Sequence, residues 1–270
     1  MSIPRALHRR LLRFAALIRA RWFWRGFTTW RQVHTWRDGS PTAAPVDPNP
    51  LSTFFENRRS GRGISKWRHY FDVYDRHFRR FRGREVNVLE IGVYSGGSLE
   101  MWRDYFGAHS HVHGVDIRPQ CKAYEAPSIT VSVGDQADRN FWRDFKSKTP
   151  ALDIVIDDGG HRPEQQVASF EELFPYLRPG GIYVCEDIGG TFNGFVMYAQ
   201  GLVHDLNSGE GGVVGNPNVR ERRQVCKTTE FQSAVASVHF YPFMVVIERT
   251  EAPVPELISS MHGTEWLVPN

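Results

Sequence analysis

Carboxylates follow two apolar runs of this chain, and their spacing could assemble a site for a divalent cation. Asp158 comes directly after the run Leu152–Asp157, and Glu186 and Asp187 lie at the end of the run 182–186. Apolar runs of this length are typical of buried parallel strands. Neighbouring strands lie about 5 Å apart, so the three carboxylates could meet around one ion. Hard oxygen ligands suit Mg2+ or Mn2+, and the sequence therefore predicts that Asp158, Glu186 and Asp187 bind one of these metals.

A histidine stands close to the first of these acids. His161 follows Asp158 by three residues, which places an imidazole beside the predicted metal, where it could act as a general base. Joint ligation by Glu186 and Asp187 requires the chain to turn, because successive residues of an extended strand point to opposite faces. The glycines of 188–190 allow such a turn. The structural alternatives are an ordinary glycine loop after Asp158, a helix cap at Asp187 and a purely structural His161.

A glycine-rich loop with the spacing E-x-G-x-x-x-G-G-S follows the apolar run Val86–Ile91. Glycines let the backbone approach a ligand closely, and the N-terminus of the next helix offers free amides. A dinucleotide-binding G-x-G-x-x-G loop would require glycine at Glu90 or Tyr94. An acid before the first glycine suits a cationic ligand better than a pyrophosphate. The loop residues that we assign to a cofactor are Glu90, Gly92, Ser95, Gly96 and Ser98.

Further acids end the next apolar runs. Asp116 ends the second run and is placed to accept hydrogen bonds from both hydroxyls of a ribose. Asp135 and Gln136 follow the third run and are placed near an adenine edge. Asp157, at the end of the fourth run, is assigned to the cofactor, with a substrate contact as the alternative. Acids at successive strand ends favour a nucleoside cofactor over the alternative, a glycine turn with acids that merely end strands.

The elements that position these residues alternate between strands and helices. The expected strands are 86–91, 111–116, 129–133, 152–157, 182–186, 234–241 and 243–248, and the clearest helices are Gly97–Phe106 and roughly 163–177. Short apolar runs separated by helical patterns are typical of a parallel sheet with crossover helices. The sequence predicts an α/β fold with a Rossmann-like doubly wound sheet, mostly parallel, that ends in a C-terminal antiparallel strand pair. Ligands of such sheets bind beyond the carboxyl ends of the strands.

Composition divides the chain into four segments. The length and the 41% hydrophobic content allow one or two domains. We expect a basic, aromatic-rich helical arm at 1–37, a Pro- and polar-rich linker at 38–50, the α/β domain at 51–250 and a tail at 251–270. Within the domain, the glycine-rich and charged stretch 207–229 is expected to form a mobile loop near the mouth of the site.

The arm at 1–37 combines many arginines with aromatic residues. Helical spacing puts Leu7, Leu11 and Phe14 on one face. Such a segment resembles a basic amphipathic helix on an anionic membrane surface. The alternative is an arm that packs on its own domain or on a second copy of the chain. We therefore expect peripheral contact with the inner face of a membrane or homo-oligomerisation through residues 1–37.

Charge and cysteine content exclude several other classes of protein. The net charge of +3 comes from the arginines of the arm, and the remainder has no basic face, so we expect no nucleic-acid partner. The three cysteines form neither a disulfide framework nor a C-x-x-C pair, which favours a reducing compartment. No run reaches the ~20 apolar residues of a membrane span, and the N-terminus has no signal-peptide pattern. We expect a cytoplasmic location.

Four motifs together resemble a known family: the glycine loop 90–98, 157–161 (DDGGH), 177–181 (LRPGG) and 186–187 (ED). They are typical of class I S-adenosylmethionine-dependent methyltransferases. The series is similar to the metal-dependent macrolide sugar O-methyltransferases of the mycinamicin and tylosin type, and it covers roughly residues 62–250. The motif 66–70 (KWRHY) also fits the wider family of natural-product and glycan methyltransferases. The resemblance implies S-adenosylmethionine and Mg2+ or Mn2+ as cofactors, and a small-molecule or glycan acceptor methylated on a sugar hydroxyl.

Three other interpretations stay open. Metal-dependent catechol O-methyltransferases look similar, with a lysine where His161 stands here. Proteins of the cephalosporin-hydroxylase type also resemble this region. The third interpretation is a methyltransferase-like binding module at a membrane, against which the acids at every expected strand end argue. An assay with both sugar and catechol acceptors separates the two methyltransferase interpretations.

Overall fold

The computed structural model of the protein describes residues 49–189, 193–208, 223–260 and 262–263. The chain divides into two units, Met1–Asp47 and Pro48–Asn270. The predicted arm at 1–37 and the predicted linker up to residue 48 lie outside the described residues. The account that follows therefore concerns the second unit.

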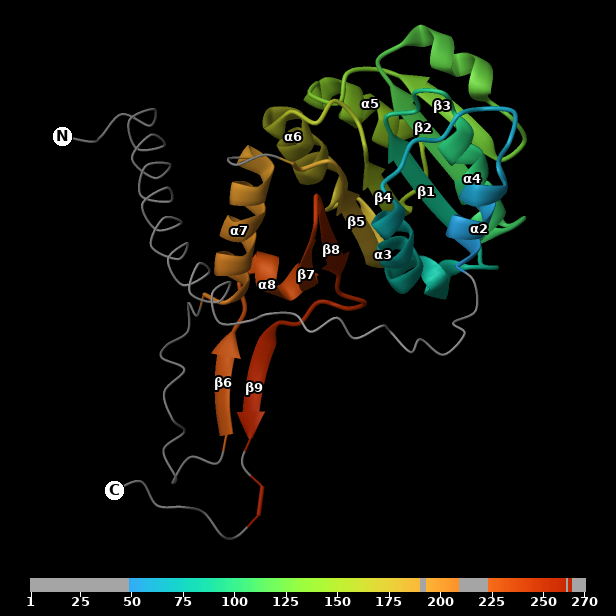
Figure 1. The fold of residues 1–270 in the computed structure, drawn as a ribbon. Helices are drawn as coiled ribbons and strands as arrows, with labels where there is room; N and C mark the ends of the chain where they lie inside the picture. Colours follow the sequence, from blue (N-terminus) through green and yellow to red (C-terminus); the bar gives the residue numbers. More distant parts are fainter. Residues whose placement is uncertain (1–48, 190–192, 209–222, 261, 264–270) are drawn as a thin grey trace, which may run out of the picture. The chain divides into compact units, whose positions relative to one another are not determined.

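The second unit is built on a seven-stranded sheet with the order β3-β2-β1-β4-β5-β8-β7 (Figure 1). Its strands are β1 (Val86–Ile91), β2 (Ser110–Asp116), β3 (Ile129–Val133), β4 (Leu152–Asp157), β5 (Leu177–Cys185), β7 (Val235–Tyr241) and β8 (Met244–Arg249). The first five strands pair in parallel, and β8 is antiparallel to both β5 and β7. The strand order reverses between β1 and β4, which is where open α/β sheets bind ligands. The structure confirms the predicted doubly wound sheet and its antiparallel end.

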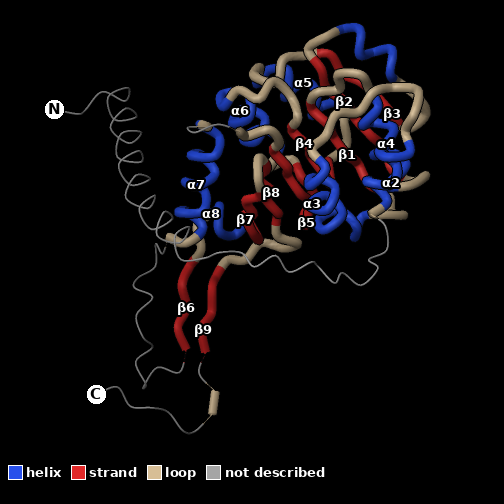
Figure 2. Tube along the Cα trace, viewed as in Figure 1, coloured by secondary structure: helices blue, strands red, loops and turns tan. Residues whose placement is uncertain are grey.

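Helices cover both faces of this sheet, as Figure 2 shows. The helices on one face are α2 (Pro50–Asn57), α3 (Arg68–Phe78) and α4 (Gly97–Phe106), and those on the other are α5 (Arg139–Lys148), α6 (Pro163–Leu173) and α7 (Gly194–Leu206). Val88 and Ile154 pack with the first layer, whereas Leu89 and Val155 pack with the second. The strands are thus buried on both sides, which explains their continuous apolar sequences. Within the described ranges, no helix combines the length and apolar content needed to cross a membrane.

Two boundaries near the fifth strand differ from the prediction. Strand β5 begins at Leu177 instead of residue 182, and α6 ends at Leu173 instead of near residue 177. The register between β4 and β5 shifts between Leu152 and Ile154, and Gly180 has a φ of 76°. A bulge therefore absorbs the Pro-Gly-Gly stretch within the strand, where the sequence pattern had indicated the end of a helix.

Helix α2 begins inside the predicted linker, at Pro50. The side chain of Asn49 accepts a hydrogen bond from the N–H of Leu51 at 3.0 Å, which caps the helix. Pro50 occupies the first helical position, where a missing N–H leaves no hydrogen bond unmade. The last two residues of the predicted linker therefore belong to the folded domain.

A second, two-stranded antiparallel sheet pairs β6 (Arg223–Lys227) with β9 (Glu256–Ser260). The prediction of a mobile loop over 207–229 is wrong for residues 223–227, and residues 209–222 lie outside the described residues. Strand β9 shows that the predicted tail contributes regular structure. Because the two strands are far apart in sequence, no hairpin turn marks their pairing.

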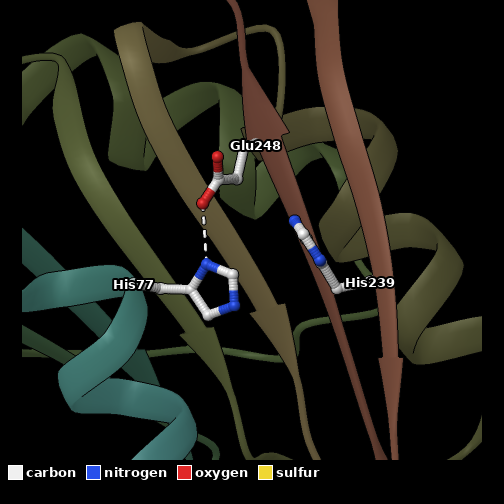
Figure 3. Close-up of side chains that lie close together, drawn as sticks. All are labelled: His77, His239 and Glu248. Atoms are coloured by element: carbon white, nitrogen blue, oxygen red, sulfur yellow. Dashed lines mark hydrogen bonds and ion pairs between the residues drawn. The ribbon is translucent and has the colours of Figure 1, made fainter.

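Helix α3 is held against the antiparallel end of the sheet by a polar contact that Figure 3 shows, between His77 of α3 and Glu248 of β8. Nδ1 of His77 lies 2.7 Å from Oε1 of Glu248, and its Nε2 lies 2.9 Å from the hydroxyl of Tyr241. The ring of His239, on β7, lies 4.8 Å from the His77 ring between centroids. Because His77 is buried, water competes little for these contacts. They fix α3, and the residues just before α3 enter the candidate site.

Candidate active site

A cavity of about 450 Å³ lies at the carboxyl ends of β1, β2 and β4, where the loops that follow these strands meet. The predicted site residues that line it are Gly92, Ser95, Ser98, Asp116, Asp135, Gln136, Asp158, His161 and Asp187. Residues 63–66, which precede α3, form a further wall. Parallel strands explain the convergence, because their carboxyl ends share one edge of the sheet. The fold thus brings most of the predicted cofactor and metal residues to one cavity.

The loop after β1 touches the loop after β4 through Gly92. Gly92 has a φ of 93°, a conformation that side-chain-bearing residues rarely adopt. A Cβ at this position would lie 2.0 Å from the backbone oxygen of Asp158. The N–H of Asp158 also donates to the carbonyl of Ile91 at 3.0 Å. Glycine is therefore required for the contact that joins the loop after β1 to the loop after β4.

Asp116 anchors the glycine loop from the end of β2. Its Oδ2 accepts hydrogen bonds from the N–H groups of Val93 and Tyr94, both at 3.0 Å, and its Oδ1 accepts from the N–H of Arg118 at 2.9 Å. Burial raises the pKa of Asp116, but the hydrogen bonds from Arg118 and Tyr94 outweigh it and lower the pKa to about 2. The guanidinium of Arg118 also covers the Tyr94 ring, 4.9 Å from its centroid. A ribose that binds Asp116 would share this carboxylate with Arg118 or displace its side chain.

Asp157 is buried and does not line the cavity. Its carboxylate accepts hydrogen bonds from Nε2 of Gln136 at 3.0 Å and from the hydroxyl of Tyr183 at 2.9 Å. Gln136, in turn, accepts from the N–H of Gly160 at 2.7 Å through its Oε1. Asp157 therefore fixes Gln136, which lines the cavity together with the exposed Asp135. Direct contact of Asp157 with a cofactor stays a prediction.

Two other predicted cofactor residues also lie behind the cavity wall. Glu90 is fully buried, and its Oε2 accepts a hydrogen bond from the Ser98 hydroxyl at 2.6 Å. Gly96, with a φ of 73°, forms the N-cap of α4. Burial raises the pKa of Glu90, while Lys66 and Ser98 oppose that rise. The direct contacts predicted for Glu90 and Gly96 stay predictions as well.

Asp158, His161 and Asp187 form a cluster whose potential ligand atoms all lie within 4.8 Å of one another. Nε2 of His161 lies 3.9 Å from Oδ1 of Asp158 and 4.0 Å from Oδ2 of Asp187. Two atoms that share one ion at ~2.1 Å can be up to about 4.2 Å apart, so these side chains fit a small divalent cation. His161 and Asp187 have φ values of 54° and 52°. Such left-handed backbone is uncommon for side-chain-bearing residues and often marks functional sites.

The left-handed turn at Asp187 separates its side chain from that of Glu186. The carboxylate of Asp187 accepts hydrogen bonds from the hydroxyl of Tyr70 at 2.8 Å and from Nε1 of Trp67 at 3.2 Å. Glu186 is fully buried and does not line the cavity. The chain turns at Asp187, but of the two acids only Asp187 lines the cavity. Ligation by Glu186 stays a prediction.

The buried partner of Glu186 is Lys66, to which the sequence analysis gave no role. Nζ of Lys66 lies 2.6 Å from Oδ2 of Asp158, 2.9 Å from Oε2 of Glu186 and 3.5 Å from Oε1 of Glu90. The Lys66 side chain is only 2% exposed. Burial lowers the pKa of Lys66, but the three carboxylates raise it more, to well above its ordinary value, so the side chain is an ammonium. The motif at 66–70 could have drawn attention to Lys66, because it fits the family. It does not show which residues Lys66 contacts.

The hydroxyl of Tyr74 supplies the other donor to Glu186, on Oε1. Burial raises the pKa of Glu186, and the charge of Lys66 opposes that rise. Tyr70 and Tyr74 also pack in the hydrophobic core, on the buried face of α3, as their helical spacing indicates. Helix α3 and the residues before it therefore hold both acids that follow β5.

Comparison with known proteins identifies a methyltransferase domain model at residues 89–188. The chain is 41% identical over 155 residues to the demethylmacrocin O-methyltransferase of Streptomyces fradiae, a match that covers 54% of this chain and 38% of that protein. It is 32% identical over 254 residues to the 8-demethyl-8-alpha-L-rhamnosyl tetracenomycin-C 2'-O-methyltransferase of Streptomyces olivaceus, over 79% of this chain and 63% of that protein. The chain thus spans less than two thirds of these relatives.

A solved structure has the same fold. The MycE methyltransferase of the mycinamycin pathway, in complex with Mg, S-adenosylhomocysteine and mycinamycin VI, matches with a TM-score of 0.59 at 28% identity, over 77% of this chain and 55% of that chain. The strand order, the glycine loop and the matched domain agree with this likeness. Residues 89–188 match a methyltransferase domain, and the chain is similar in sequence and fold to the macrolide sugar O-methyltransferases.

Proposed function

We propose that this protein is an S-adenosylmethionine-dependent, divalent-metal-assisted O-methyltransferase that acts on a hydroxyl of a sugar in a glycosylated natural product or glycan. The observation that carries the proposal is a single cavity that gathers two sets of predicted residues. We refer to Gly92, Asp116 and Gln136 as its cofactor end, and to Asp158, His161 and Asp187 as its metal end. The relatives named as sugar O-methyltransferases support the acceptor class.

The end near the glycine loop fits the cofactor. Asp116 stays ionised and can accept hydrogen bonds from ribose hydroxyls. Gln136 is held in place by Asp157 and would contact the adenine edge of the cofactor. Glu90 places a buried negative charge behind the loop, which favours a ligand with a sulfonium and an ammonium group.

The acidic end fits the acceptor and a metal. Asp158 and Asp187 would hold Mg2+ or Mn2+, with Glu186 as the further predicted ligand. A bound divalent ion lowers the pKa of an acceptor hydroxyl. His161 would remove the proton of that hydroxyl, because its side chain is 40% exposed and its Nε2 faces both carboxylates. Methyl transfer is a displacement, so the methyl group of the cofactor and the acceptor oxygen must be aligned. A single cavity that holds both ligands would allow this alignment.

The experiment that tests this function combines binding with turnover. Calorimetry of the whole chain should detect binding of S-adenosylhomocysteine and of Mn2+. Glycosylated macrolide and tetracenomycin-type acceptors, together with a catechol, are then incubated with S-adenosylmethionine, and the products are analysed by mass spectrometry. We expect a methylated sugar on at least one glycosylated acceptor. Methylation of the catechol alone would replace the sugar proposal with the catechol-type function.

A further inference from the structure

The Lys66 ammonium joins three strand ends that the proposed function uses separately. Its partners are Glu90 of β1, Asp158 after β4 and Glu186 after β5, at 3.5, 2.6 and 2.9 Å. Because the side chain is 2% exposed, these charges interact through a medium of low effective dielectric, and little water screens them. Lys66 itself lines the cavity beside Asp158. One buried cation therefore lies between the cofactor end and the metal end.

The two oxygens of Asp158 show how Lys66 acts on the metal end. Oδ2 contacts the Lys66 ammonium, and Oδ1 faces His161 across 3.9 Å. An ammonium donates up to three hydrogen bonds, and a carboxylate has about four acceptor positions. Lys66 can therefore orient Asp158 and Glu186 while leaving lone pairs of both free for a metal ion. Partners that orient metal ligands in this way strengthen metal binding.

Accepting the proposed function, we infer that Lys66 is a positioning residue that couples metal binding to cofactor binding. Its ammonium fixes the carboxylates of Asp158 and Glu186 for the metal, and through Glu90 it links them to the cofactor end. The two ligands therefore bind cooperatively. Lys66 is not the base of the reaction, because its nitrogen is protonated and buried among acids.

The test measures the binding of Mn2+ and S-adenosylhomocysteine by calorimetry, each with and without the other. In the unmodified chain we expect each ligand to tighten the other by roughly 5–150-fold. Lys66→Met keeps the length of the side chain and removes its charge. We expect it to weaken Mn2+ binding about 10–100-fold and to abolish the cooperativity. Lys148→Met, an exposed lysine paired with Asp144, is the matched control and should behave like the unmodified chain.

Two further variants keep the inference testable if Lys66→Met does not fold. Lys66→Arg retains the positive charge and should retain most of the cooperativity. Glu90→Gln removes the link to the cofactor end and should leave Mn2+ binding alone nearly unchanged while abolishing the cooperativity. A folded Lys66→Met variant with unchanged Mn2+ affinity and cooperativity would overturn the inference, as would cooperativity that survives in Glu90→Gln. If the unmodified chain binds neither ligand, the proposed function itself fails.

Discussion

Nε2 of His161 lies 3.9 Å from Oδ1 of Asp158, on a residue whose backbone has a φ of 54°. This strained conformation turns the imidazole toward the carboxylates of Asp158 and Asp187, which we propose hold a metal ion. The spacing leaves room for an ion or an acceptor oxygen between His161, Asp158 and Asp187. The roles of the metal and of the base can therefore be tested separately.

The first prediction concerns removal of the metal. Treatment with EDTA should abolish methylation, and added Mg2+ or Mn2+ should restore it, because hard oxygen ligands favour these ions. Asp158→Asn should reduce Mn2+ affinity in calorimetry, whereas Asp144→Asn, at an exposed aspartate on α5, should not. Full activity of the metal-free enzyme would refute metal assistance.

The second prediction assigns the base. His161→Ala should lower kcat by about 10²–10⁴-fold, the usual contribution of general acid-base catalysis. The variant should bind S-adenosylhomocysteine and Mn2+ as the unmodified chain does, and the alkaline rise of its pH-rate profile should disappear. A marked loss of Mn2+ affinity would instead make His161 a metal ligand. An unchanged pH-rate profile would place the base on another residue.

The third prediction concerns the cofactor end. Asp116→Ala should weaken S-adenosylhomocysteine binding by about 1–3 kcal/mol, because hydrogen-bonding groups of the ligand and the loop lose their partner. The native pKa of Asp116, about 2, is below its ordinary value. The carboxylate is therefore ionised above about pH 3, and its contribution is lost only as the pH falls toward 2. Calorimetry between pH 5 and 8 should show no loss of affinity from this group, and wild-type affinity in Asp116→Ala would exclude the ribose role.

The site illustrates what strand patterns can and cannot predict. Asp116 and Asp158 follow apolar runs, so the common edge of a parallel sheet predicts that they converge. Lys66 precedes the sheet and lies 92 residues from Asp158 in sequence, and no periodic pattern connects the two. Their contact depends on how α3 packs, through residues such as His77 and Glu248 that meet only in the folded chain.

Alternation within a strand also explains the outcome for neighbouring acids. Asp157 and Asp158 stand side by side in sequence, but Asp157 points to Gln136 and Tyr183, while Asp158 reaches the cavity. The sequence predicted a cofactor contact for Asp157, because the pattern does not show which of two adjacent acids reaches the cavity. Likewise, the bulge in β5 is defined by how β5 pairs with β4. The local Pro-Gly-Gly sequence does not reveal that pairing.

The fourth prediction tests the contact between the two loops. Gly92→Ala places a Cβ 2.0 Å from the Asp158 carbonyl oxygen and requires a φ of 93°. We expect a destabilisation of more than ~1–3 kcal/mol, since strain and a backbone clash add, together with loss of S-adenosylhomocysteine binding. Gly201→Ala is the control, because Gly201 lies in α7 with open space around it. That variant should be as stable as the unmodified chain or gain about 0.5–1 kcal/mol. Equal melting temperatures and ligand affinities for the two variants would contradict the structural role of Gly92.

The last prediction uses a histidine in the core of the sheet. His113 of β2 is 8% exposed, and burial, with a smaller effect of His111, lowers its pKa to about 4. As the pH falls from about 6.5 to 4, the unfolded chain takes up a proton that native His113 does not, so the folded state loses stability across this window. The loss of folding free energy is on the order of a few kcal/mol at pH 4 and smaller at pH 5. Urea unfolding at pH 7, 6 and 5 should show this decline, and His113→Gln should flatten it. His109→Gln, at an exposed position just before β2, should leave the decline unchanged. An identical pH slope in the unmodified chain and in His113→Gln would show that His113 does not remain neutral in the fold.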